Sequence, residues 1–209
     1  ATVGPGLVGA LLVGVSAAKA TALALDVPFV GVNHLEAHLY AALLDDPNVE
    51  FPMLFVLVSG GHTMFVAMND PHDYRVVGQT IDDAAGEAFD KVARYLDLGF
   101  PGGPAIDKAA TRGNDKAIDF PRAMLNEGLD VSFSGLKTAV INYVRAHPNV
   151  SNDDVAASFQ RAVVDVLVHK ARLAARECNA RTVALGGGVA ANTLLRREMQ
   201  RAAADDGLR

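Results

Sequence analysis

The stretch MLFVLVSGGHTMFVAM, residues 53–68, decides the fold class of this chain. Its first six residues are all apolar, which predicts a strand buried on both faces rather than an amphipathic one. Gly60 and Gly61 then turn the chain back into a second apolar run, so the two runs are expected to form a hairpin. A strand covered on both faces needs helices as neighbours, and this arrangement is typical of an α/β protein.

Strands, glycine turns and helices recur outward from this hairpin. Further strands are expected at residues 28–32, 74–80 and 181–187. Helices are expected at residues 7–25, 34–44, 86–98, 134–147, 152–178 and 189–204, with another starting near Pro104. Residues 2–6 and 45–48 indicate turns, and residues 113–132 look irregular. The expected boundary between lobes lies near residues 50–52, which gives a first lobe of residues 1–50 and a second of residues 51–209.

Composition is ordinary for a soluble globular protein, with 209 residues, 50% of them hydrophobic. A formal net charge of −5 gives no reason to expect a polyanionic partner, so any nucleic-acid contact would be local or shared with another subunit. Two basic groups are candidates, although a solvated helix face explains them better: Lys170, Arg172, Arg176 and Arg181, and Arg196, Arg197 and Arg201. The single cysteine, Cys178, excludes an intrachain disulfide and fits a reducing cytoplasm.

The first 18 residues carry no charged side chain, which raises the question of a membrane anchor. The GPG at residues 4–6 breaks the run early, Lys19 interrupts it later, and no basic leader is present. We therefore expect a helix buried on most sides and no membrane contact. Gly9 and Gly14 would let a neighbouring element pack closely against it.

The segment GVNHLEAHLY places His34 and His38 four residues apart on an expected helix, which Asn33 can cap. Two imidazoles at this spacing lie on one helix face and can bind one divalent metal ion. A zinc protease has its glutamate directly after the first histidine, whereas Glu36 lies about 200° around the helix from both histidines. The pattern therefore indicates a metal site without the protease base, and two ligands require at least one more from elsewhere.

Three glycine-rich turns follow or precede expected elements. The turn at residues 59–62 and the PGGP at residues 101–104 offer backbone N–H groups. A simple hairpin with positive φ explains the first turn better, and a plain loop explains PGGP about equally well. ALGGGVAAN, residues 184–192, is more specific, because a strand enters three glycines and a helix leaves them. It is not the GxGxxG of a dinucleotide-binding fold. Asp90 is expected on a small, apolar helix face and can point inward.

Seven motifs follow one another along the chain: GPGLVGALLVG, NHLEAHL, LVSGGHT, IDDAAGEAFDK, FPGGP, SFSGLKTA and GGGVAAN. In this order they resemble the TsaD family, the bacterial tRNA adenosine threonylcarbamoyltransferases once called glycoproteases or O-sialoglycoprotein endopeptidases. The resemblance implies an α/β, actin-like ATPase fold with two lobes, of which the first is incomplete here. It also implies transfer of the threonylcarbamoyl group from threonylcarbamoyl-AMP to N6 of the tRNA adenosine next to the anticodon.

The resemblance also implies roles for particular residues. His34 and His38 match the family's metal ligands, with a divalent ion that is iron or zinc. The substrate-binding positions match Leu57, Val58, Ser59, Gly60, Gly61, Asp90, Gly103, Asp107 and Asn192. No residue stands out as a catalytic base, because an amine that attacks an activated anhydride needs positioning more than deprotonation.

Relative to the family pattern, the chain starts after an acidic first strand and stops before the aspartate that would be the third metal ligand. We therefore expect the 209-residue chain to bind metal weakly, to lack transferase activity and to be poorly stable alone. The family implies tRNA, an ATP-like nucleotide, a TsaB-type paralogue and a TsaE-type ATPase as partners, in the cytoplasm. The alternatives are a metal-dependent hydrolase or glycoprotease, and a non-catalytic scaffold of the same fold.

Overall fold

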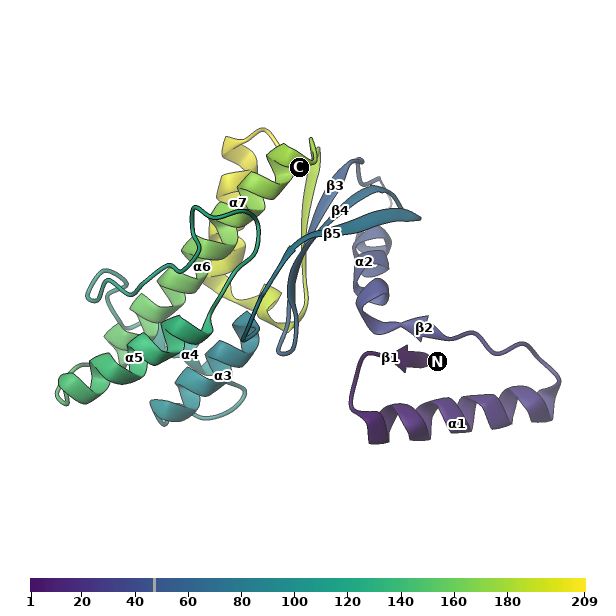
Figure 1. Cartoon of the computed structure of the whole chain (residues 1–209), viewed down its shortest axis with the longest axis horizontal. Coiled ribbons are helices and arrows are strands. Elements are labelled where there is room, and N and C mark those ends of the chain that lie inside the picture. The colour runs from purple at the N-terminus through teal and green to yellow at the C-terminus, as the bar shows by residue number, and fades with distance from the viewer. Residues whose placement is uncertain (47) are drawn as a thin grey trace. The chain divides into compact units, whose positions relative to one another are not determined.

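The computed structural model describes residues 1–46 and 48–209 and divides into two compact units, Ala1–Asn48 and Val49–Arg209 (Figure 1). The division falls a few residues before the boundary expected near residues 50–52. The expected turn at residues 45–48 includes Pro47, which lies outside the described residues.

A four-stranded sheet forms the centre of the second unit, in the order β5-β4-β3-β6. Its strands are β3 (Met53–Val58), β4 (Thr63–Asp70), β5 (Asp73–Gln79) and β6 (Thr182–Gly186). Every residue of β3 is buried, and β3 pairs antiparallel with β4, so the buried strand and the hairpin are both confirmed. β6 runs parallel to β3 on its other side, which brings the carboxyl ends of these two strands to the same edge of the sheet.

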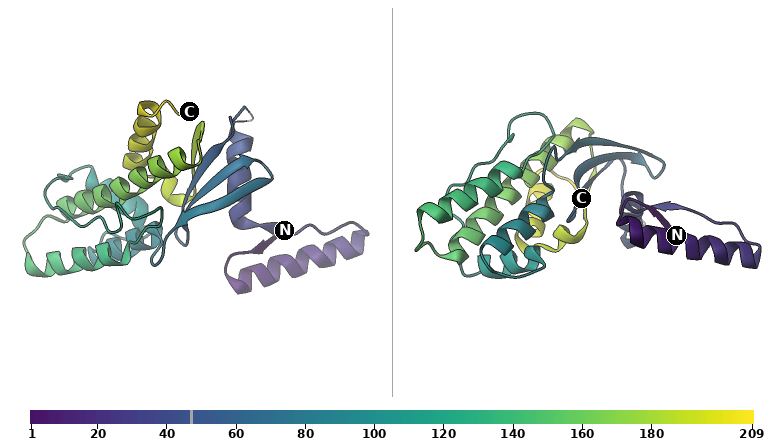
Figure 2. Two further views of the ribbon diagram at one scale, coloured as in Figure 1. Left: turned by 45° about the horizontal axis from the view of Figure 1, so that its top comes forward. Right: turned by 60° about the horizontal axis from the view of Figure 1, so that its bottom comes forward.

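The helices of this unit gather on one side of the sheet (Figure 2). They are α3 (Ala85–Tyr95), α4 (Gly102–Ala110), α5 (Ser134–Ala146), α6 (Asn152–Glu177) and α7 (Thr193–Asp205). The long helix α6 packs against β3, β4, α4 and α7. Its buried Phe159 meets Phe89 of α3 edge to face, with ring centroids 5.2 Å apart, in the middle of one contiguous apolar core.

Several element boundaries differ from the sequence expectation, among them the end of α3, which lies at Tyr95 and not at Leu98. α4 begins at Gly102, two residues before the expected Pro104. The last helix begins at Thr193 rather than Val189, because residues Gly188–Ala191 form a short 3₁₀ helix, η1. Asn192 then caps α7 by accepting a hydrogen bond from the backbone N–H of Leu195 at 2.9 Å. Residues 113–132 are irregular, as expected. They contain no helix, and their one β-bridge joins Val131 to Thr80.

Lys170 does not belong to a solvated face, and that expectation is wrong for it. Its side chain is fully buried on α6, and Nζ donates hydrogen bonds to the carbonyl oxygens of Glu127 and Gly128 at 2.9 and 2.7 Å. Burial lowers the pKa of this lysine. Lys170 therefore holds the irregular segment, residues 113–132, against α6.

The first unit contains a two-stranded parallel sheet and two helices. Its elements are β1 (Thr2–Gly4), α1 (Val8–Leu25), β2 (Val32–Asn33) and α2 (His34–Asp45). The two helices are confirmed, and Asn33 caps α2 by accepting hydrogen bonds from the N–H groups of Leu35 and Glu36. The expected turn at residues 2–6 is partly wrong because its first residues form β1, and the expected strand at 28–32 shrinks to β2.

The expectation that α1 is buried on most sides is wrong, because none of its residues is buried. The physical reason is that one helix and two very short strands give the first unit too little surface to cover an 18-residue apolar helix. By length and composition alone, α1 is apolar enough to cross a membrane, with a mean hydropathy of 1.8. That this segment makes no membrane contact stays a prediction.

Candidate functional site

Two turns lie at the carboxyl ends of the parallel neighbours β3 and β6, and a cavity of about 500 Å³ opens beside them. In open α/β sheets, ligands bind at this end of the strands. The cavity is lined by Gly60, Gly86, Asp90, Pro101, Gly103, Pro104, Asp107, Gly188, Val189, Ala191 and Asn192. Segments from four parts of the second unit therefore converge on one hollow.

The first turn, residues 59–62 after β3, contains two glycines whose backbone dihedral angles other residues could also adopt. Neither Gly60 nor Gly61 adopts the left-handed region, so the hairpin is present but the positive φ expected at its glycines is wrong. A Cβ at either position would have nothing within 4 Å. The turn is instead closed by Ser59, whose Oγ accepts a hydrogen bond from the N–H of His62 at 3.0 Å. Glycine here leaves open space through which a ligand can approach the backbone.

Other glycines are needed for close packing rather than for access. A Cβ on Gly86 would lie 2.5 Å from the carbonyl oxygen of Ser59, because the start of α3 is pressed against the first turn. The N–H of Gly86 donates to that same oxygen at 3.2 Å. Gly187 has φ +94°, and a Cβ there would collide with the carbonyl oxygen of Val58. Both glycines therefore hold the cavity walls together.

Asp90 fixes the N-terminus of α4 at the rim of the cavity. Its Oδ1 accepts a hydrogen bond from the N–H of Gly102 at 2.7 Å. Among the described residues its Oδ2 has no hydrogen-bond partner, so this oxygen remains free to accept a donor from a ligand. Next along α4, Gly103 lines the cavity with open space beside its Cα.

Asp107 of α4 meets Asn192 in the lining of the cavity. Asp107 accepts hydrogen bonds from the N–H of Thr193 at 3.2 Å, from its hydroxyl at 2.9 Å and from Asn192 Nδ2 at 3.3 Å. Asn192 is 6% exposed and also donates to Gln160 Oε1 at 2.9 Å. A carboxylate has about four lone-pair positions, so Asp107 retains room for one further donor.

The structure brings five of the nine expected substrate residues into this cavity and places four outside its lining. The five are Gly60, Asp90, Gly103, Asp107 and Asn192, and the four are Leu57, Val58, Ser59 and Gly61. The side chains of Leu57 and Val58 are fully buried in the sheet, so only their main chain is available to a ligand. Sequence reasoning missed the other six lining residues, although all belong to motifs quoted from the chain: Gly86, Pro101, Pro104, Gly188, Val189 and Ala191.

The charge of the lining is acidic. Asp90 and Asp107 are the charged side chains in it, and no described lining residue is a lysine or arginine. Carboxylates accept hydrogen bonds from hydroxyl or amino groups, whereas a phosphate here would have to be met by backbone N–H groups of the turns. The arrangement fits a ligand with hydroxyl groups at one end and an anionic group near glycines.

The histidine pair lies in the first unit, on the first two turns of α2. The imidazole rings of His34 and His38 have centroids 4.7 Å apart at an interplanar angle of 61°. This places two nitrogen donors on one face, which fits part of a divalent metal site. Within residues 1–46 and 48–209, no group of three metal-ligating side chains occurs, so the third ligand expected from elsewhere is not supplied there.

Comparison with known proteins adds a family match over the entire chain. The sequence model of the family described as "TsaD: tRNA N6-adenosine threonylcarbamoyltransferase" matches residues 1–209. Curated relatives carry the same description. The chain is 56% identical to one from Desulfitobacterium hafniense and 55% identical to one from Moorella thermoacetica, each over 99% of this chain and 62% of the relative. The chain therefore spans about three fifths of these relatives' length.

Solved structures of low sequence identity share the fold. HypF from T. kodakarensis matches with a TM-score of 0.73 at 18% identity, over 100% of this chain and 36% of HypF. Component A of (R)-2-hydroxyglutaryl-CoA dehydratase from Acidaminococcus fermentans matches with a TM-score of 0.54 at 14% identity, over 86% of this chain and 61% of that protein. These likenesses confirm the α/β, actin-like ATPase fold expected from the sequence.

Proposed function

Because this chain belongs to the TsaD family of tRNA N6-adenosine threonylcarbamoyltransferases, we propose that its protein transfers the threonylcarbamoyl group of threonylcarbamoyl-AMP to tRNA. The acceptor is N6 of the adenosine next to the anticodon. The observation that carries the proposal is the cavity at the ends of β3 and β6, where glycine turns and two carboxylates face one hollow.

The lining suits the AMP part of such a substrate. Asp90 Oδ2 and the remaining acceptor position of Asp107 can take hydrogen bonds from ribose hydroxyls. Gly60 and Gly188 leave open space beside their Cα atoms, where a phosphate or a flat adenine ring can approach the main chain. The cavity volume of about 500 Å³ lies within the usual range for a small-molecule site.

The reaction needs positioning more than acid–base chemistry. The N6 amine attacks the carbamoyl carbon and forms a C–N bond, the bond from that carbon to the phosphate oxygen breaks, and AMP leaves with the electron pair. The amine passes one proton to solvent. The chain contributes by holding the anhydride still beside the turns and the N-terminus of α4, which lowers the entropic cost of reaching the transition state.

His34 and His38 are the residues that would hold the divalent ion, iron or zinc, together with a third ligand from outside the described residues. A bound divalent ion supplies Lewis acidity that polarises a carbonyl group. Glu36 lies two positions from each histidine, so it is poorly placed as the base of a hydrolase. This geometry favours the transferase over the glycoprotease alternative.

The proposal extends to partners and location. We expect tRNA, a TsaB-type paralogue and a TsaE-type ATPase to act with the protein in the cytoplasm, without membrane contact. The acidic net charge of −5 is consistent with tRNA binding shared among subunits rather than carried by this chain alone.

The experiment uses a chimera in which residues 1–209 replace the matching segment of the Desulfitobacterium hafniense relative. It is supplied with that organism's partner subunits, tRNA, threonine, bicarbonate, ATP and the enzyme that forms the adenylate. Digested tRNA is then searched for threonylcarbamoyladenosine by mass spectrometry. The unmodified relative is the positive control, and the chimera with His34→Ala and His38→Ala tests the metal pair.

Product from the chimera and none from the histidine variant would support both the transfer and the metal pair. A folded chimera that forms no product while the relative does would reject the proposed function for this chain. Product that persists in the histidine variant would keep the transferase and reject the metal assignment. Partner binding by a chimera without activity would instead favour the scaffold alternative.

A further inference from the structure

The side-chain amide of Asn192 lines the ligand cavity, and both its nitrogen and its oxygen are bound by protein groups. Its two amide hydrogens have two acceptors, Gln160 Oε1 at 2.9 Å and Asp107 Oδ1 at 3.3 Å. Its Oδ1 accepts from the N–H of Leu195 at 2.9 Å. The side chain therefore joins α4, α6 and α7, and one lone pair of Oδ1 remains available.

Only one orientation of this amide satisfies the network. Exchange of oxygen and nitrogen would set an amide donor against the N–H of Leu195 and an amide oxygen against the Asp107 carboxylate. Gln160 makes the shorter of the two bonds from Nδ2, and it is itself only 4% exposed on α6. A buried acceptor of this kind is costly to leave unpaired, so the contact strongly favours the observed orientation.

We propose that Gln160 is a positioning residue of the ligand cavity, which it shapes by fixing the amide of Asn192. With the amide fixed, Asn192 Nδ2 continues to donate to Asp107, and Asn192 Oδ1 continues to cap the first turn of α7. Gln160 is absent from the cavity lining and acts through Asn192 and Asp107. The inference rests on the proposed function and deepens it, because it identifies a residue that shapes the part of the cavity where the nucleotide would bind.

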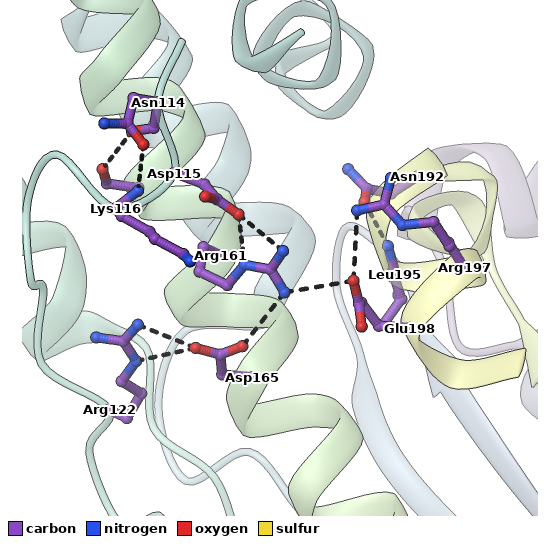
Figure 3. Close-up of polar contacts among 11 residues, drawn as sticks. Asn114, Asp115, Lys116, Arg122, Arg161, Asp165, Asn192, Leu195, Arg197 and Glu198 are labelled. Carbon is purple, nitrogen blue, oxygen red and sulfur yellow. Dashed lines mark hydrogen bonds and ion pairs between the residues drawn. The ribbon is translucent and has the colours of Figure 1, made fainter. Parts of the chain in front are cut away.

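The neighbouring residue on α6 offers a matched control. Arg161 ties the same two helices together through Glu198 of α7 at 3.5 Å, and it also pairs with Asp115 and Asp165 (Figure 3). Arg161 lines a separate charged hollow and not the ligand cavity. Loss of Arg161 removes a link between α6 and α7 but leaves the Asn192 amide untouched.

The experiment compares Gln160→Met and Arg161→Gln in the 209-residue chain. Affinity for AMP is measured by calorimetry, thermal unfolding gives stability, and NMR follows hydrogen exchange of the Asn192 side-chain amide. Gln160→Met is expected to weaken AMP binding about tenfold and to speed exchange of one Asn192 amide proton, because one acceptor is gone. Arg161→Gln is expected to lower the unfolding temperature with AMP affinity unchanged.

Equal AMP affinity in wild type and in folded Gln160→Met would overturn the inference, whatever the change in stability. Rapid exchange of both Asn192 amide protons in the wild type would overturn it too. This measurement uses the wild type alone, so it does not depend on whether a variant folds. A folded wild-type chain that binds no AMP would count against the proposed nucleotide site, while the exchange data would still decide the role of Gln160.

Discussion

Arg172 of α6 and Asp206, at the end of α7, are joined by two hydrogen bonds with nitrogen–oxygen distances of 2.6 and 2.5 Å. Arg176 adds a third contact to the same carboxylate at 3.2 Å. The hydrogen bond from Arg172 is the main reason that the pKa of Asp206 falls to about 2. α7 is therefore held against α6 at its far end by charge and at its near end, beside the ligand cavity, by Asn192.

Replacing this carboxylate gives a stability change with a defined pH dependence. Asp206→Asn should lower the free energy of unfolding by about 1 kcal/mol near neutral pH, because the pair is bidentate but partly exposed. The pKa is depressed in the folded state, so the contribution is present above the ordinary aspartate pKa and fades as pH falls toward 2. Urea unfolding at pH 6 and pH 3 tests this. Asp205→Asn is the control, and equal losses in both variants would contradict the assignment.

Asp82 caps the N-terminus of α5, which begins 52 residues later in the chain. Its carboxylate accepts hydrogen bonds from the hydroxyls of Ser132 and Ser134 and from the N–H groups of Phe133 and Ser134, at 2.5 to 3.3 Å. Burial would raise the pKa of Asp82, but these hydrogen bonds outweigh it and lower the pKa to about 2. Asp82→Ala should therefore cost about 1–2 kcal/mol at neutral pH.

The cost of Asp82→Ala should shrink as pH falls below about 4, because protonation removes the native carboxylate that accepts these bonds. Chemical denaturation at a series of pH values gives the curve, and hydrogen exchange at Phe133 and Ser134 should quicken in the variant. Ser134→Ala removes one donor and should show a smaller loss. A stability difference that does not change with pH would argue against the capping role.

Features set by local sequence were predictable. The uninterrupted apolar run gives β3 and its burial, and Asn33 before a helical pattern gives the cap of α2. The start of α7 was missed because a glycine turn hides where a helix begins, while the deciding signal is the capping bond of Asn192 to Leu195. Lys170 was missed because a buried lysine depends on carbonyl groups about 40 residues away in sequence.

The candidate site also combines residues that local sequence predicts with residues whose roles depend on packing. The positions of Asp90, Gly103 and Asp107 followed from motifs, and the fold brings them to one cavity. The role of Gly86 depends on how close α3 comes to the carbonyl of Ser59, which no local pattern shows. The exposure of α1 depends on which surfaces surround it, because its apolar residues are spread around the whole helix.

Lys170→Met tests whether the buried ammonium group holds the irregular segment. Removal of the donor leaves the carbonyls of Glu127 and Gly128 without it, which should cost about 1–3 kcal/mol of stability. Hydrogen exchange at Gln79 and Val131 should quicken. The N–H of Val131 donates to the carbonyl oxygen of Gln79 at 3.0 Å, and the N–H of Gln79 donates to Asp130 Oδ1 at 2.9 Å, directly after this anchor. Lys116→Met, at an exposed lysine, is the control. Unchanged stability and exchange in Lys170→Met would contradict the anchoring role.

The histidine pair predicts weak binding of a divalent ion by the 209-residue chain. Two imidazole ligands fall short of the three protein ligands of a typical zinc site, so affinity for Zn²⁺ should be no tighter than about micromolar. His34→Ala with His38→Ala should abolish this binding in a calorimetric titration. His72→Ala with His147→Ala removes two other histidines and should leave it unchanged. Equal loss in both double variants would show that binding is not specific to α2.

Gly60→Ala and Gly86→Ala separate the two uses of glycine at the cavity. A Cβ at Gly86 would meet the backbone of Ser59 and Gly60 at 2.5 and 2.8 Å, so Gly86→Ala should cost about 1–3 kcal/mol of stability. A Cβ at Gly60 has nothing within 4 Å, so Gly60→Ala should leave stability within about 0.5 kcal/mol.

Gly60→Ala should nevertheless weaken AMP binding, by about tenfold, because the added methyl group occupies the space through which a ligand reaches the turn. Thermal unfolding and calorimetric titration of both variants distinguish the two effects. Gly99→Ala is unsuitable as a control because its φ of +100° adds backbone strain, whereas Gly135→Ala on α5 also has open space and lies outside the lining. If Gly60→Ala and Gly135→Ala bind AMP equally well, the first turn does not contact the nucleotide, and the substrate would have to be held by α4 and the turn after β6 alone.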